Sequence, residues 1–208
     1  ANVGRVLLSE FGSDIKNEAR AYAAAASDAR MSGCELPVVI VTGSGNQGIT
    51  ASVPVIRYAK HIGASDERLY RALLVSDLVT IHQKTGIGRL SAYCGAVSAG
   101  CGAGAGIAYL LGGDYRAIAH TIVNAVAILS GTICDGAKPS CAAKIASAVE
   151  AGILGYYMYV NDQQFRGGDG IVAKGVENTI RNVGLLASQG MKQTDRVILN
   201  IMTGDQCL

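Results

Sequence analysis

Cysteines are the residues of this chain with the widest chemical reach, and two of them flank the expected start of a helix. The six cysteines are Cys34, Cys94, Cys101, Cys134, Cys141 and Cys207. Cys134 stands on a glycine-bearing loop, and Cys141 falls in the first turn of a helix that Pro139 should begin. The positive end of a helix dipole lowers a thiol pKa and favours the thiolate that a metal requires. Cys94 would join them from a helix whose small side chains leave room for a bulky cofactor.

The spacing of these cysteines leaves other fates open. None forms the C-x-x-C pattern of a zinc site or a ferredoxin, and each could be a buried, inert thiol. An even count also raises a disulfide framework, but such frameworks serve small secreted domains with poor cores. This chain has 208 residues, half of them hydrophobic, and shows no export signal. We therefore expect reduced thiols in a cytoplasmic protein.

A glycine-rich segment offers a second kind of chemistry. Residues 43–48, Gly-Ser-Gly-Asn-Gln-Gly, match the G-x-G-x-x-G dinucleotide pattern, follow an apolar run and open a helix. That pattern works within a βαβ unit with an acid about 20 residues further on, and here Asp66 and Glu67 begin a helix instead. The exposed N–H groups of such a loop still form an anion site for a phosphate or a carboxylate. A plain turn between two helices is the alternative.

The elements that must position these groups follow one another as helices. They are expected at residues 14–33, 49–62, 66–84, 90–111, 115–129, 139–160, 172–188 and 195–202. Glycine-rich loops join them, and only residues 38–41 are compatible with a short extended segment. The sequence predicts an all-α, multi-helix bundle, with residues 1–208 as one domain.

Two of these helices carry more specific expectations. Within 66–84, apolar residues recur at a helical period, and they are Leu69, Leu73, Leu74, Leu78 and Ile81. Residues 90–111 are rich in glycine and alanine, with a break expected near Cys101. A membrane span of such small residues is an alternative for this segment. A tightly packed buried helix is the better interpretation.

Composition and charge narrow the range of partners. The net charge is +2, and lysine and arginine are scattered along the chain without a basic run, so no nucleic-acid partner is expected. The 27 glycines, two phenylalanines and no tryptophan predict a core of small side chains. A helical surface rich in glycine and alanine would also suit a homodimer.

Five segments together resemble one known family. They are residues 25–31, 43–49, 84–88, 93–96 and 134–141. They are similar to the serine dehydratase alpha-domain-like proteins, and within these to the branch that includes L-cysteine desulfidase. The resemblance implies that Cys94, Cys134 and Cys141 ligate a [4Fe–4S] cluster. It also implies a cytoplasmic lyase that converts L-cysteine to pyruvate, ammonia and sulfide, or L-serine to pyruvate and ammonia.

The same resemblance implies roles for polar residues beside the cluster. Catalytic roles fall to Lys84 and Asn46, without fixing which group is the general base. The substrate carboxylate would bind to the glycine-rich segment, with Arg89 adding charge. The segment's substrate-binding residues are Ser44, Gly45, Asn46, Gln47 and Gly48. An anion- or nucleotide-binding module that uses this segment without a metal is the alternative function.

One departure from the family pattern concerns length. Family members are much longer, and an N-terminal half with its own cysteine motif precedes the matching segments. That half is expected to act as a partner of this chain, which alone would hold a damaged cluster or none, and would be inactive. Related dehydratases place a C-terminal cysteine on the open iron, a role that Cys207 is a candidate to fill.

Overall fold

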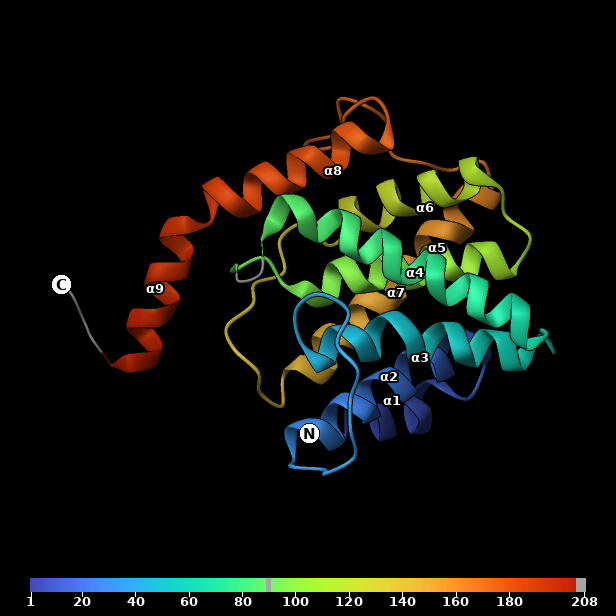
Figure 1. The fold of residues 1–208 in the computed structure, drawn as a ribbon, viewed down its shortest axis with the longest axis horizontal. Coiled ribbons are helices and arrows are strands. Elements are labelled where there is room, and N and C mark those ends of the chain that lie inside the picture. The colour runs from blue at the N-terminus through green and yellow to red at the C-terminus, as the bar shows by residue number, and fades with distance from the viewer. Residues whose placement is uncertain (89–90, 205–208) are drawn as a thin grey trace.

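The computed structural model describes residues 1–88 and 91–204 and shows a bundle of helices (Figure 1). The elements in chain order are α1 (Val3–Phe11), α2 (Ile15–Met31), α3 (Gly45–His61), α4 (Asp66–Ile87), α5 (Gly95–Leu110), α6 (Tyr115–Ile128), α7 (Cys141–Val160), α8 (Val176–Leu185), the π-helical turn η1 (Leu186–Gly190) and α9 (Lys192–Thr203). Within the described residues there is no strand, only a single antiparallel bridge between Tyr93 and Ile133. The predicted all-α class is confirmed.

α5 lies at the centre of the bundle and packs against α3, α4, α6 and α7. Its glycines permit direct contact between backbones. A methyl group on Gly104 would lie 2.6 Å from the carbonyl oxygen of Gly152 on α7, and one on Gly106 would lie 2.8 Å from that of Ala72 on α4. The break expected near Cys101 is wrong, because α5 runs without interruption. Close packing on two faces offsets the low helix propensity of glycine.

α4 turns its smallest side chains toward α5. Ala72, Ser76 and Thr80 are fully buried, whereas Leu74 and Leu78 are 59% and 61% exposed. The predicted apolar period therefore marks the core face only in part, because Leu69 and Leu73 pack against the core while Leu74, Leu78 and Ile81 are exposed. The glycine-lined face of α5 leaves room only for small side chains, so Leu74 and Leu78 lie outside.

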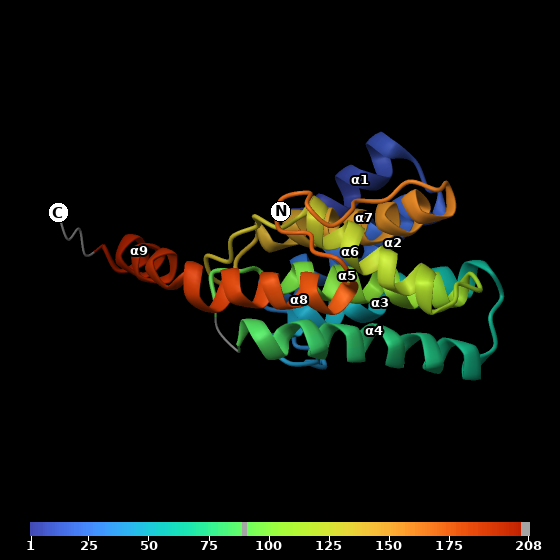
Figure 2. The same ribbon diagram turned by 90° about the horizontal axis from the view of Figure 1, so that it is seen from above.

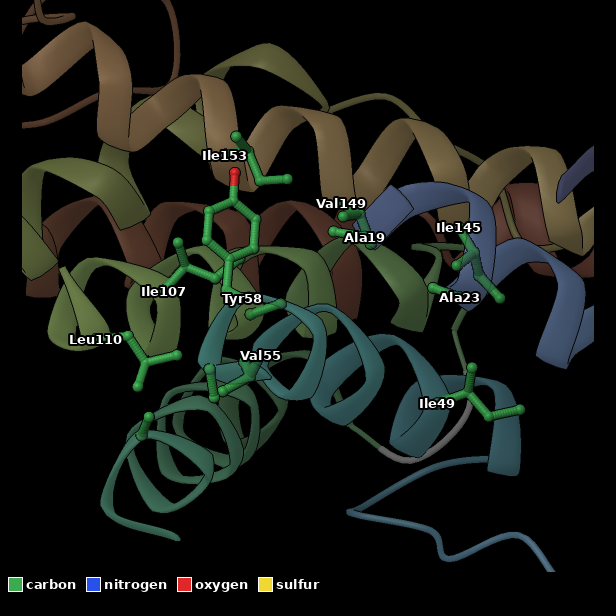
Figure 3. Packing of buried hydrophobic residues seen from close by; sticks show 13 residues of the cluster. Ala19, Ala23, Ile49, Val55, Tyr58, Ile107, Leu110, Ile145, Val149 and Ile153 are labelled. Atoms are coloured by element: carbon green, nitrogen blue, oxygen red, sulfur yellow. The ribbon is translucent and has the colours of Figure 1, made fainter. Parts of the chain in front are cut away.

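The main core lies between α2, α3, α5 and α7 (Figure 3). Tyr58 and Val55 of α3 meet Ile107 and Leu110 of α5, and the ring of Tyr58 extends toward Ile153 of α7. Each of these side chains is at most 1% exposed. Burying a large aliphatic side chain contributes about 1.5–3 kcal/mol, so this cluster fixes how the helices cross.

Several boundaries differ from those predicted. α1 was not expected, and α3 begins at Gly45 rather than at residue 49. Pro54 therefore lies inside α3 instead of near its first turn. α7 begins at Cys141, with Ser140 as its N-cap, two residues after the proline expected to start it. Residues 38–41 form no strand but lie across α3, where the carbonyl oxygen of Val39 occupies the space that a Gly48 side chain would need.

The C-terminal elements leave the body of the bundle. α8 packs on α4 and α6, and the π-helical turn η1 leads into α9, which projects away from the bundle (Figures 1 and 2). No residue of α9 is buried. Its Met202 nevertheless approaches Gly136 of the α6–α7 loop, because a methyl group on that glycine would lie 3.2 Å from the Met202 methyl carbon. None of the helices in the described ranges is long and apolar enough to cross a bilayer.

Candidate functional site

The site predicted from the cysteines lies at one end of the bundle, where the α6–α7 loop crosses the segment before α5. Cys94 donates its backbone N–H to Thr132, with an N···O distance of 3.1 Å, and Cys134 donates its own to Ala92 at 2.6 Å. The bridge between Tyr93 and Ile133 lies between these two bonds. These pairings hold Cys94, the N-cap of α5, opposite Cys134.

The thiols of Cys94 and Cys134 form a hydrogen bond, and it separates their ionisation. This bond lowers the pKa of Cys134, helped by the N–H of Gly136 and the charge of Lys144, although burial opposes them. The same bond, together with burial, raises the pKa of Cys94. Cys134 is therefore the more acidic thiol of the pair.

Cys141 joins the same loop from the first residue of α7. Its Sγ lies 3.5 Å from the carbonyl oxygen of Gly136, the residue whose N–H faces the Cys134 sulfur. One peptide segment thus carries two of the thiols, and Cys94 faces it. Across residues 1–88 and 91–204, however, no three His, Cys, Asp or Glu side chains converge closely enough to hold a single metal ion.

Lys84 approaches the two paired thiols from α4. It is 6% exposed, and it forms no ion pair with a carboxylate in the described part of the chain. Burial lowers its pKa, while Cys134 and Cys94 act in the opposite sense. Among the residues that the structure describes, Lys84 is thus a buried amine beside two thiols and without a carboxylate partner.

A second group of charges fixes the loop itself. Asp135 pairs with Lys138 and with Lys144, and Lys144 Nζ also donates to the carbonyl oxygen of Ile133 at 2.8 Å. The two lysines lower the pKa of Asp135 to about 2. Burial lowers the pKa of Lys144, but the contacts with Asp135 outweigh it and the net shift is upward. Lys144 thus ties α7 to the strand-like segment beside Cys134.

The glycine-rich segment begins α3 close to the start of α5. Residues Gly45 to Gly48 form the first turn of α3 and are buried. Gln47 Oε1 accepts from the backbone N–H of Thr42 at 3.0 Å, while its Nε2 is buried without a hydrogen-bond partner. A methyl group on Gly95, the residue after Cys94, would lie 3.7 Å from that nitrogen. Gln47 thus brings a free donor to the cysteine end.

The other polar residues predicted for the site are placed less directly. Asn46 accepts from Arg30 through its Oδ1 at 3.1 Å and directs its Nδ2 to the sulfur of Met31, so both ends of its amide face α2. Ser44 is exposed and is the N-cap of α3 without a side-chain cap bond. Arg89 lies outside the described residues.

Three residues that the sequence analysis did not single out are buried near Cys94 with polar atoms lacking partners. They are Gln83, through Oε1, Tyr93, through its hydroxyl, and Ser98, through Oγ. Burial, followed by the charges of Cys101 and Cys94, raises the pKa of the Tyr93 hydroxyl. A tyrosine directly before a cysteine was visible in the sequence, but nothing in the pattern indicated that its hydroxyl would be enclosed.

The remaining cysteines divide by environment. Cys34 is exposed, and Cys101 is buried in the middle of α5, where burial raises its pKa to about 12. All of the cysteines in the described part of the chain are free thiols. Cys207 lies outside that part.

Comparison with known proteins places this arrangement in a family. The family described as serine dehydratase alpha chain matches residues 1–200. The chain belongs to the serine dehydratase alpha chain family. This membership confirms the resemblance drawn from the cysteine and glycine motifs.

Relatives within the serine dehydratase alpha chain family are similar over nearly the whole chain. A UPF0597 protein of Desulfitobacterium hafniense is 70% identical over 207 residues, which are 100% of this chain and 48% of that protein. UPF0597 proteins of Lachnoclostridium phytofermentans and Fusobacterium nucleatum are 56% and 50% identical, with 97% of this chain and 48% of each relative covered. The chain thus spans about half the length of these relatives. No solved structure matches it.

Proposed function

We propose that this chain is the cluster-binding part of an iron–sulfur lyase that removes the β-substituent and the amino group of L-cysteine or L-serine. The proposed ligands of the [4Fe–4S] cluster are Cys94, Cys134 and Cys141. The observation that supports this most is the gathering of these thiols at one end of the bundle beside the buried amine of Lys84. Membership in the serine dehydratase alpha chain family agrees with a lyase.

The donor set suits an iron–sulfur cluster in its chemistry. Thiolates are the protein ligands of such clusters, and the loop environment lowers the pKa of Cys134. Cys94 is the N-cap of α5 and Cys141 is the first residue of α7, so both thiols stand at helix N-termini. A four-iron cluster is broader than one ion, so its ligands need not converge on a point as those of a single metal do. Lys144, whose pKa is raised, adds positive charge that would balance an anionic cluster.

The rest of the site would bind and deprotonate the amino acid. When bound, a cluster held by three thiolates supplies a Lewis acid for the thiol or hydroxyl on the substrate's β-carbon. The first turn of α3 would hold the substrate carboxylate, since the N–H groups of Gly45 and Asn46 have no side-chain cap and Gln47 Nε2 is free. Arg89 is a further candidate for this charge.

Lys84 is our candidate for the group that takes the α-proton. Its burial lowers its pKa and moves the amine toward the neutral form that a base requires. As the Cα–H bond breaks, the β-substituent leaves with its bonding electrons and an enamine remains. The enamine tautomerises to an imine, and water releases pyruvate and ammonia. Asn46 would act by positioning the α3 turn, because its amide is bound to α2.

The alternative of a nucleotide-binding module loses its structural basis. A G-x-G-x-x-G loop binds a dinucleotide at the edge of a parallel sheet, and the described residues form no sheet. The glycines here serve close packing instead, with Gly48 against Val39 and Gly45 against Arg30. An anion at the N-terminus of α3 remains compatible with the site, and we assign that place to the substrate carboxylate.

The complete catalyst would include the part of the longer relatives that this chain does not span. A reducing compartment such as the cytoplasm would keep the thiols free for the cluster. The function is tested by anaerobic reconstitution with iron and sulfide, followed by assay of pyruvate from L-cysteine and L-serine. The chain is assayed alone and together with the remaining half of the Desulfitobacterium relative.

We expect pyruvate from at least one of the two amino acids, and much less from Lys84→Gln at unchanged iron content. Lys60→Gln, an exposed lysine at the far end of α3, is the matched control and should keep its activity. An iron-loaded protein that forms no pyruvate in either arrangement would refute the lyase. Full activity in Lys84→Gln would remove that residue from the reaction.

A further inference from the structure

A cavity of about 340 Å³ lies at the opposite end of α6 from the cysteine loop. It is formed by the first turns of α6, the 164–167 loop and the residues that lead into α8. Cys134 follows the other end of α6, a helix of 14 residues that is about 20 Å long. The cavity is therefore separate from the proposed lyase site.

Buried polar residues hold the walls of this cavity in place. Asn124 is fully buried, donates to the carbonyl oxygen of Gly155 at 3.0 Å and accepts from the N–H of Phe165 at 3.0 Å. Thr179, also fully buried, accepts from the N–H of Ala173 at 3.1 Å. The loop that carries one wall is thus fixed to α6, α7 and α8 rather than resting on the surface.

The charged side chains that line the cavity are all basic. They are the exposed Arg116 on α6 and, on the facing loop, the exposed Arg166 and Lys174, and His120 of α6 also lines the cavity. None of the three permanent cations forms an ion pair within the described ranges. Burial, followed by the charge of Arg116, lowers the pKa of His120.

Acidic side chains close in sequence to the lining residues have other partners, among them Glu177, which pairs with His82 at 2.8 Å. Asp114 caps α6 by accepting from the N–H of Ala117 at 2.9 Å, and Asp169 accepts from the N–H of Arg166 at 2.6 Å. Neither lines the cavity. Three cations around one hollow repel each other unless an anion lies between them.

The floor of the cavity is apolar. Val123 and Val172 are 6% and 4% exposed, and Phe165 is half-buried beside them. A ligand that fills the hollow would therefore have an apolar body as well as a charged group. The volume of the cavity is at the lower end of the range for small-molecule sites, about 300–1,000 Å³.

We infer that this cavity binds a small phosphate monoester, with the phosphate among Arg116, Arg166 and Lys174 and the organic group against the valines. A monoester carries nearly two negative charges at neutral pH, so it balances three cations better than a carboxylate does. Arginine also binds phosphate oxygens through two parallel N–H bonds. The site is independent of the cluster and of the lyase reaction.

Calorimetric titration with phenyl phosphate tests this inference, because the probe joins a dianion to a flat apolar ring. We expect saturable binding that weakens with added salt, and binding at least about tenfold weaker for benzoate, which has one charge. Arg116→Gln and Lys174→Gln should each weaken phenyl phosphate binding by about tenfold. Phenol should not bind measurably.

The matched control is Arg196→Gln, which removes an exposed arginine from α9, far from the cavity. It should bind the probe as the unmodified chain does, and circular dichroism should show that all variants are folded. Absence of phenyl phosphate binding to the unmodified chain would overturn the inference. This negative result is the one expected if the cavity receives another polypeptide instead. Equal losses in Arg196→Gln and Arg116→Gln, or equal affinity for benzoate, would also overturn it.

Discussion

The middle of α5 and its beginning are built under opposite constraints. In the middle, Gly104 and Gly106 touch the backbones of α7 and α4, and no space remains for a side chain. At the beginning, Gly95 has ordinary space beside it, and the buried Nε2 of Gln47 and hydroxyl of Tyr93 have no hydrogen-bond partners. The middle of α5 is thus closely packed, whereas its beginning has buried polar groups without hydrogen bonds, which lowers stability. Such unsatisfied groups are typical of functional sites.

The largest expected effect on stability comes from adding a methyl group to a glycine in the middle of α5, compared with the same change at its beginning. Gly104→Ala would place a methyl carbon 2.6 Å from the Gly152 oxygen, so α5 and α7 must move apart. We expect the free energy of unfolding, from urea denaturation, to fall by about 3 kcal/mol. Gly95→Ala places its methyl carbon 3.7 Å from Gln47 Nε2 and should cost nothing measurable. Equal losses in the two variants would contradict the contrast between middle and beginning.

A smaller effect of the opposite sign is expected at Lys84. Replacing this buried lysine, which lacks a carboxylate partner, by methionine removes the cost of burying its charge. Lys84→Met should therefore raise the free energy of unfolding of the apo chain by about 1 kcal/mol. Thermal denaturation measured by circular dichroism checks this. A less stable variant would mean that Lys84 serves the fold rather than the site.

Lys144 provides the matched comparison, because this lysine lies at the same end of the bundle as Lys84 but has a carboxylate partner. Its contacts with Asp135 and with the carbonyl oxygen of Ile133 hold the cysteine loop to α7. Lys144→Met should lower the free energy of unfolding by about 1 kcal/mol, measured as for Lys84→Met. If Lys84→Met and Lys144→Met shifted the free energy of unfolding in the same direction, the presence or absence of a carboxylate partner would not decide how these lysines affect stability.

The smallest expected effect concerns pH and Asp135. Its lysine neighbours lower its pKa from 3.8 to about 2, so the carboxylate stabilises the fold above about pH 4 and this contribution is lost as the pH falls toward 2. The pairs are partly solvated, and Asp135→Asn should cost less than about 1 kcal/mol at pH 7. Denaturation of the unmodified chain and of Asp135→Asn between pH 7 and pH 2 should show the difference in their free energies of unfolding disappearing below pH 4. A gap independent of pH would assign the effect to something other than charge.

Much of the fold was predictable because helix signals are local. α4 and α6 begin at residues 66 and 115 as predicted, where Ser65 and Asp114 cap them, and the glycine–alanine segment is a buried helix. The break expected near Cys101 failed because low glycine propensity is a local property, whereas contact with α7 is not. The core face of α4 was likewise set by its neighbour, which accepts Ser76 and Thr80 but excludes Leu74.

The candidate site was predictable in part. Local signals placed Cys141 at a helix N-terminus, which the structure shows. The approach of Cys94 to Cys134 depends on the single bridge between Tyr93 and Ile133, and no periodicity encodes such a pairing. Asn46 was predicted to face the substrate, but its amide faces Arg30 of another helix, a contact that local sequence signals do not reveal. Which side of α3 faces the cysteines became known only from the packing of α2, α3 and α5.

The proposed function depends most on the three cysteines acting together on one cluster. The direct test is the iron and acid-labile sulfide content of the chain after anaerobic reconstitution, compared among serine variants of Cys94, Cys134 and Cys141 and the control Cys34→Ser. We predict about four irons and four sulfides in the unmodified chain and in the control, and a severe loss in each of the other three. A folded chain that takes up no iron, or one whose iron depends on Cys34 as much as on Cys141, would contradict the proposal.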